Sequence, residues 1–270
     1  EAMGREEDTA ELRRELDRTR NLRSLANYYA GWANYYLAFV ANSPANANRA
    51  MEQFGVLLNA APGRAPTVER AGSGRFSYEH VARAALGCAM CAAILRDDIE
   101  ARRWIEAVDL SENLAAGVRE QMFSRRVIVS ASAGNWAEID AVVRKHRTRE
   151  SNASGLLTLA EARLLAVLAL EAAGSNATLP RTRELAGDIA QVAMGDLVAL
   201  GEAGHVLNLV DRYGTSGLVG EGFISSYVRG LHAYDAAMEA KAAAKEPAEQ
   251  PTERPEIANQ FREAAAMLKA

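Results

Sequence analysis

Apolar side chains recur along this chain at steps of three and four residues, the spacing that places them on one side of an α-helix. Strict alternation of apolar and polar residues, the mark of a half-buried strand, is absent. Residues 8–41 contain no proline and a single glycine, Gly31. This stretch predicts one long helix, or two nearly continuous ones, with a seam of large residues along one side: Leu25, Tyr29, Trp32, Tyr36 and Phe39.

The rest of the chain divides into further helices separated by turn-forming segments. Proline, glycine and polar residues mark irregular stretches at 62–77 and 214–222. The predicted fold class is all-α. We expect five segments: an N-terminal amphipathic helix at 1–24, three helix pairs at 25–147, less regular pairs at 148–245, a proline-rich polar linker at 246–255, and the C-terminal helix of a last pair at 256–270.

Large and small residues follow a set order between Ala30 and Pro62. Trp32 lies early in the first predicted helix, and Ala50 opens the second. Phe54 follows four residues after Ala50, and Pro62 ends the unit. This order resembles the tetratricopeptide repeat, whose units are pairs of helices.

Two less regular copies of the unit follow. Ala101 lies 51 residues after Ala50, and this excess over the family period of ~34 residues fits an inserted loop. Ala137 lies 36 residues after Ala101. Arg83 stands where the second copy needs an aromatic residue, and Ala141 where the third needs a large one. Related helical-pair repeats therefore remain open.

The resemblance implies a right-handed superhelix of antiparallel helix pairs, an α-solenoid in which the first helix of each pair lines a concave groove. It also implies a non-catalytic scaffold that binds a protein or peptide partner in that groove. The competing hypothesis is an exported protein that binds a small molecule or a glycan on the same kind of scaffold. Neither hypothesis calls for a cofactor.

Composition and charge exclude several classes of protein. Apolar residues make up 49% of the chain and charged residues 24%, as in ordinary globular proteins. The net charge of −4 argues against a dedicated nucleic-acid-binding protein. The longest apolar run, residues 156–173, is interrupted by three charged residues, so we expect no membrane span. Cytoplasmic and exported locations, the oligomeric state, and whether the native chain continues beyond Ala270 are all open at this point.

Six aromatic residues of the predicted first helix form the first candidate binding site. At 100° per residue they fall within an arc of about 120°. We expect most of this arc to pack against neighbouring helices, although tyrosines also suit half-wet binding sites. Tyr28 and Tyr35, at the edge of the arc, are the expected exposed residues, and a ligand would contact them together with Trp32.

A local excess of positive charge forms the second candidate. Residues 119–149 contain seven basic and three acidic residues. If their helix lines a groove, Arg125 and Arg126 would face an acidic peptide or another anion. The alternative is an ordinary solvated helix end, which residues 144–149 fit well because cations are favourable near a helix C-terminus.

Other motifs indicate structure and not chemistry. Cys88 and Cys91 are expected in the core, since their helical run lacks the further ligands that a zinc site needs. Asp97 and Asp98 are read as capping a helix. The loop at 214–222 lacks the lysine of a phosphate-binding loop and is read as a connector. The sequence predicts no catalytic residue and no metal site.

Overall fold

The computed structural model of the chain describes residues 2–61, 64–150, 152–214, 223–243 and 255–269. Helices joined by short connections make up this described part, and no strand occurs within it. The predicted all-α class is therefore confirmed. Residues 246–254 of the expected linker and residues 215–222 of the glycine-rich stretch lie outside the described residues, and Pro255 is helical.

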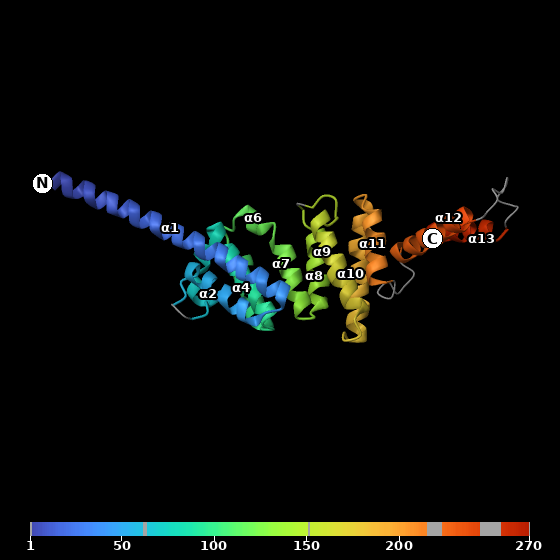
Figure 1. Cartoon of the computed structure of the whole chain (residues 1–270), viewed down its shortest axis with the longest axis horizontal. Coiled ribbons are helices and arrows are strands. Elements are labelled where there is room, and N and C mark those ends of the chain that lie inside the picture. Colours follow the sequence, from blue (N-terminus) through green and yellow to red (C-terminus); the bar gives the residue numbers. More distant parts are fainter. Residues whose placement is uncertain (1, 62–63, 151, 215–222, 244–254, 270) are drawn as a thin grey trace. The chain divides into compact units, whose positions relative to one another are not determined.

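Two compact units divide the chain, Glu1–Asn135 and Trp136–Ala270. The boundary falls between the two helices that were expected to form the third pair. The helices of the first unit (Figure 1) are α1 (Ala2–Ala41), α2 (Pro44–Leu57), α3 (Val68–Ala71), the 3₁₀ helix η1 (Ser73–Ser77), α4 (Glu79–Ile94), α5 (Asp98–Asp109), α6 (Ala116–Arg119) and α7 (Met122–Ser132).

The second unit continues the helical pattern. Its described helices are α8 (Trp136–Arg147), α9 (Leu159–Gly174), α10 (Pro180–Ala199), α11 (Ala203–Tyr213), α12 (Phe223–Ala243) and α13 (Pro255–Lys269). Within each unit, consecutive helices pack against one another as hairpins: α1 with α2, α4 with α5, α9 with α10, and α12 with α13. Helical hairpins are thus the building blocks of both units.

Local capping chemistry fixes where several helices begin. The Ser43 hydroxyl accepts a hydrogen bond from the Asn46 amide, and Pro44 occupies the first turn of α2. Asp97 caps α5 by accepting a hydrogen bond of 3.1 Å from the Glu100 amide. This contact confirms the predicted capping role of Asp97.

A single phenyl ring is in contact with three helices of the first unit. Phe54 of α2 is fully buried between Gly31 of α1 and Gly87 of α4. A Cβ atom added at Gly31 would lie 2.5 Å from the ring, and one added at Gly87 would lie closer still. The two glycines therefore leave the space that the ring fills, and they set how closely α1 and α4 approach α2.

The side of α1 that packs is not the side predicted. Gly31, Tyr35 and Ala38 are buried, and they define the face toward the core. The expected packing of the aromatic arc is wrong for Tyr29, Tyr36 and Phe39, which are 63%, 56% and 64% exposed. The physical reason is the close approach at Gly31, which turns the face that carries Gly31, Tyr35 and Ala38 toward α2 and α4. The upstream leucines are exposed as well: Leu12, Leu16, Leu22 and Leu25.

Matching positions are buried in two of the three expected copies. Ala50 and Phe54 of α2 are fully buried. Their counterparts on α5, Ala101 and Ile105, are at most 2% exposed. In the third copy Ala137 is exposed. The buried positions of α8 are instead Trp136, Ile139 and Val143.

Candidate functional site

The structure brings together two candidate residues from distant parts of the sequence. The guanidinium carbon of Arg125, on α7, lies 5.4 Å from the ring centroid of Trp32, on α1. A guanidinium over an indole face at this distance makes a cation–π interaction. Trp32 is half-buried, and its ring also contacts Phe54 with a centroid separation of 5.4 Å. The tryptophan thus connects the core to the surface at this point.

The two tyrosines expected at the exposed edge of the arc lie toward the core. Tyr28 is half-buried and Tyr35 is only 5% exposed. Burial raises the pKa of Tyr35 to about 12, although the positive charge of Arg125 acts in the opposite direction. The expectation that Tyr35 faces solvent is wrong, because Tyr35 lies on the same packed face of α1 as Gly31. Tyr35 supports Trp32, at a ring separation of 5.5 Å.

Two donor groups at this site lack partners within the described part of the chain. The indole N–H of Trp32 is buried and meets no acceptor there. Arg125 is half-buried and takes part in none of the ion pairs found among the described residues. The Trp32 N–H is closed to solvent, so Arg125 is the donor of this pair that an acceptor on another molecule could reach.

Arg126 does not join this cluster. Its Nη2 atom lies 3.0 Å from the Oδ2 atom of Asp109 on α5, so its charge is already paired. Successive residues on a helix point about 100° apart, which directs Arg126 away from the side that Arg125 takes. Of the five candidate residues, the structure gathers Tyr28, Trp32, Tyr35 and Arg125 and separates Arg126.

Sequence reasoning expected most of the surface beside this cluster to be packed, and the structure exposes it; we call this surface the aromatic face of α1. It consists of Leu22, Leu25, Tyr29, Tyr36, Phe39 and Val40, each 49% exposed or more, and it borders Trp32. No charged residue occurs between Arg23 and Arg49. A contiguous uncharged apolar surface of this kind marks a site of interaction more often than a solvated helix face.

Reactive and metal-binding groups do not provide a competing site in the described part of the chain. Cys88 and Cys91 are fully buried in α4, as predicted, and burial raises the pKa of both thiols. No group of three or more histidine, cysteine, aspartate or glutamate side chains is placed to hold a metal ion there. Nor does any described helix have the length and apolarity to cross a bilayer.

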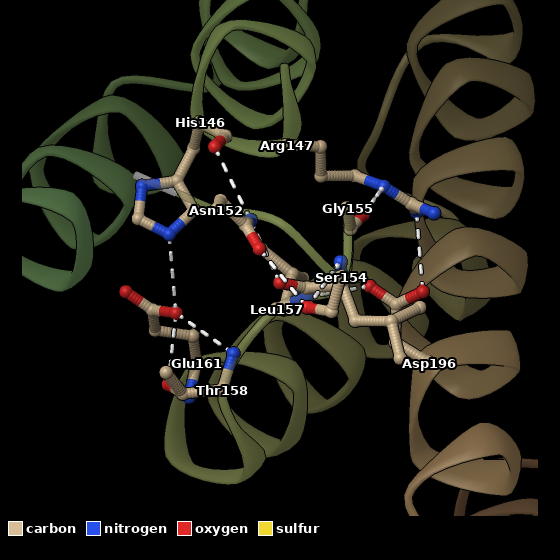
Figure 2. Close-up of polar contacts among 10 residues, drawn as sticks. His146, Arg147, Asn152, Ser154, Gly155, Leu157, Thr158, Glu161 and Asp196 are labelled. Atoms are coloured by element: carbon tan, nitrogen blue, oxygen red, sulfur yellow. Dashed lines mark hydrogen bonds and ion pairs between the residues drawn. The ribbon is translucent and has the colours of Figure 1, made fainter. Parts of the chain in front are cut away.

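The second unit contains a polar cluster at the junction of α8, α9 and α10. Figure 2 shows Asp196 of α10 beside the guanidinium of Arg147 and the backbone of Leu157. Asp196 Oδ2 accepts a hydrogen bond of 2.9 Å from the Leu157 amide, and Oδ1 lies 3.3 Å from Arg147 Nη1. Arg147 also donates to the Gly155 carbonyl at 2.8 Å.

The same cluster continues to the start of α9. Thr158 and Glu161 form a capping box, each side chain bonding the backbone amide of the other. His146 Nε2 lies 3.3 Å from Glu161 Oε2, which connects the end of α8 to this cap. Every one of these contacts fixes a helix end or the loop between helices. We therefore interpret the cluster as structural.

The buried carboxyl of Asp196 gives this cluster a measurable signature. Burial raises its pKa above the ordinary aspartate value, against the lowering effects of the Leu157 amide and the Arg147 charge. We predict that a carbon-13 NMR titration finds a raised pKa for Asp196, and that Arg147→Gln raises it further. Because the pKa of Asp196 is raised on folding, protonation of this carboxyl adds to the free energy of unfolding. This contribution is complete below the pKa of aspartate in the unfolded chain, and it is lost as the pH rises through the pKa of Asp196 in the folded chain. A pKa at or below the ordinary value would contradict this account.

Comparisons with known proteins add no family. No protein-family model, curated protein or solved structure matches the chain. The proposal for function therefore depends on the surfaces described above.

Proposed function

We propose that this protein is a non-catalytic scaffold that binds another polypeptide through the aromatic face of α1 and the adjoining Trp32–Arg125 pair. The observation that carries the proposal is an uncharged surface with three aromatic residues at least 56% exposed, next to the half-buried guanidinium of Arg125. Aromatic and arginine side chains are the ones that contribute most at protein interfaces.

The proposal includes a tetratricopeptide-like arrangement of the helix pairs. Two features support it: hairpin packing of consecutive helices, and burial of Ala50, Phe54, Ala101 and Ile105 at matching positions. α1 and α7, which carry Trp32 and Arg125, are both expected first helices of a pair. First helices are the ones that would line a concave groove in such a superhelix, and a partner peptide would dock along them.

The glycan-binding alternative receives less support. That hypothesis expected an enclosed pocket with Tyr28 or Tyr35 exposed in it, and Tyr28 is half-buried. Tyr35 is 5% exposed and packs behind Trp32, so its ring is not accessible for stacking on a sugar. The accessible aromatic residues lie along the length of one helix, which suits an extended polypeptide better than a compact ligand.

A site-specific photocrosslink tests the proposal. A photoreactive phenylalanine at Tyr36, in the chain expressed in its native host, is expected to give covalent adducts with a polypeptide. The same group at Leu110, which is 80% exposed on the same unit, serves as the matched control and is expected to give far fewer adducts. Equal adduct yields at the two positions, or none at either, would overturn the proposal.

A further inference from the structure

The spacing of large residues on the aromatic face is that of a helix–helix seam. Leu22, Leu25, Tyr29, Trp32, Tyr36 and Phe39 follow one another at steps of three, four, three, four and three. This is the heptad pattern of positions a and d, which places knobs from one helix into holes of a facing helix. The seam covers 17 helical steps, or about 26 Å at 1.5 Å per residue.

Among the described residues of the first unit, only Trp32 of this seam is largely covered, by Phe54 and Arg125. The packed face of α1, with Gly31, Tyr35 and Ala38, points toward α2 and α4, whereas most seam residues are at least half exposed. Upstream, every residue from 11 to 23 is exposed, and Figure 1 shows no other helix of its unit beside that stretch of α1. A lone helix of that length is only marginally stable in water.

We propose that the occupant of the seam is a second copy of α1, paired antiparallel about a two-fold axis between Ala30 and Gly31. This inference rests on the proposed function and names the partner. In that register each a position faces a d position of the other chain. Every member of the seam then meets another member: Leu22 faces Phe39, Leu25 faces Tyr36, and Tyr29 faces Trp32.

Shape and charge both favour a second copy. The end layers pair a leucine with an aromatic ring, so large and small side chains alternate across the interface. Ala26 and Ala33, both exposed, flank the seam and let the two helices approach closely. The absence of charge between Arg23 and Arg49 removes any like-charge repulsion between identical helices.

The pairing also supplies an acceptor for Arg125, which is half-buried beside Trp32. With Tyr29 of one chain opposite Trp32 of the other, a tyrosine ring and hydroxyl come beside the guanidinium. The hydroxyl oxygen accepts hydrogen bonds, and the ring face attracts the cation. No carboxylate is needed at this point.

The available area predicts a reversible dimer. A whole aromatic side chain can bury about 150–250 Å² of surface. The exposed parts of Tyr29, Tyr36 and Phe39, together with those of Leu22, Leu25 and Val40, then offer roughly 600 Å² per chain for burial. Two chains together would bury about 1,200 Å², the lower limit for specific protein interfaces. The dimer is therefore expected to dissociate on dilution.

Sedimentation velocity at increasing concentration is the first test. The wild-type chain is expected to shift from monomer to dimer, and the double variant Tyr29→Glu/Tyr36→Glu to remain a monomer throughout. Both tyrosines are more than half exposed, so the variant should keep the wild-type circular dichroism spectrum. Ile99→Glu, at a position 77% exposed on α5, is the matched control and should dimerise as the wild type does.

Engineered cysteines test the register. Under mild oxidation, Leu25→Cys/Tyr36→Cys is expected to form a covalent dimer through two symmetric disulfides. Each single cysteine variant should form little, because in the antiparallel register it faces no cysteine. Within one helix, positions 25 and 36 lie about 16 Å apart and cannot pair. Cys88 and Cys91 are buried and do not compete.

Three outcomes would overturn the inference: a wild-type chain that stays monomeric, single-cysteine variants that crosslink as well as the double variant, or a dimer that survives Tyr29→Glu/Tyr36→Glu. A monomeric chain whose photocrosslink at position 36 captures a different polypeptide overturns self-pairing and leaves the docking function intact. A monomeric chain that yields no adduct overturns both.

Discussion

Gly87→Ala is expected to destabilise the first unit by about 1–3 kcal/mol, the usual cost of forcing an extra carbon into a packed core. The added Cβ would overlap the ring of Phe54, which is fully buried. The ring has no direction of escape, because its other side lies against Gly31. The clash outweighs the gain in helix propensity from glycine to alanine, which is at most ~1 kcal/mol. Hydrogen exchange of α1, α2 and α4 measures the effect.

Two variants separate this clash from a general sensitivity to alanine. Phe54→Leu shortens the opposing side chain, so the double variant Gly87→Ala/Phe54→Leu should be more stable than the sum of the single effects implies. Gly195→Ala on α10 has no atom within 4 Å of the added carbon and should stabilise its own unit by about 0.5–1 kcal/mol. A Gly87→Ala chain as stable as the wild type would show that Phe54 does not fill the space between the glycines.

Asp196→Ala is expected to destabilise the second unit by about 3 kcal/mol, toward the lower limit for breaking a buried ion pair. The side chain of Asp196 is 4% exposed, and its removal leaves the amide of Leu157 buried without an acceptor. Arg147 loses its carboxylate partner as well, but it is 30% exposed and reaches water. Denaturant unfolding monitored by segment-resolved hydrogen exchange should show the loss in α9 and α10.

The control for Asp196 lies on the same helix. Asp188 of α10 is exposed, so Asp188→Ala removes an equal charge without uncovering a buried amide. Its effect should stay within about 0.5 kcal/mol, as for most surface substitutions. Equal losses from the two variants would mean that the contacts of Asp196 contribute nothing beyond charge.

Helix positions were predictable from the sequence because apolar spacing and capping residues are local signals. Proline at position 180 and the aspartate at position 97 begin helices as expected. The orientation of α1 was not predictable in this way. Side-chain size alone suggested that the aromatic residues point inward, whereas the two glycines around Phe54 decide which face packs.

The candidate site was predictable in part. Trp32 and Arg125 were each singled out, Trp32 by the aromatic arc and Arg125 by local charge, yet no local pattern indicates that they meet. Arg126 follows Arg125 directly in the sequence, and its side chain points to a different side of α7. Its ion pair with Asp109 depends on how α5 packs. Contacts of this kind come from tertiary packing, which a single sequence does not reveal.

The most direct test of the central claim is oxidative footprinting of Tyr29, Tyr36 and Phe39 in cells that make the protein, compared with the purified chain at high dilution. Tyr78, which is 62% exposed on the same unit, provides the internal reference. We expect the three residues of the aromatic face to be protected in the cell and labelled on dilution, while Tyr78 is labelled in both. Equal labelling of the aromatic face under both conditions would contradict the claim that it is a docking surface.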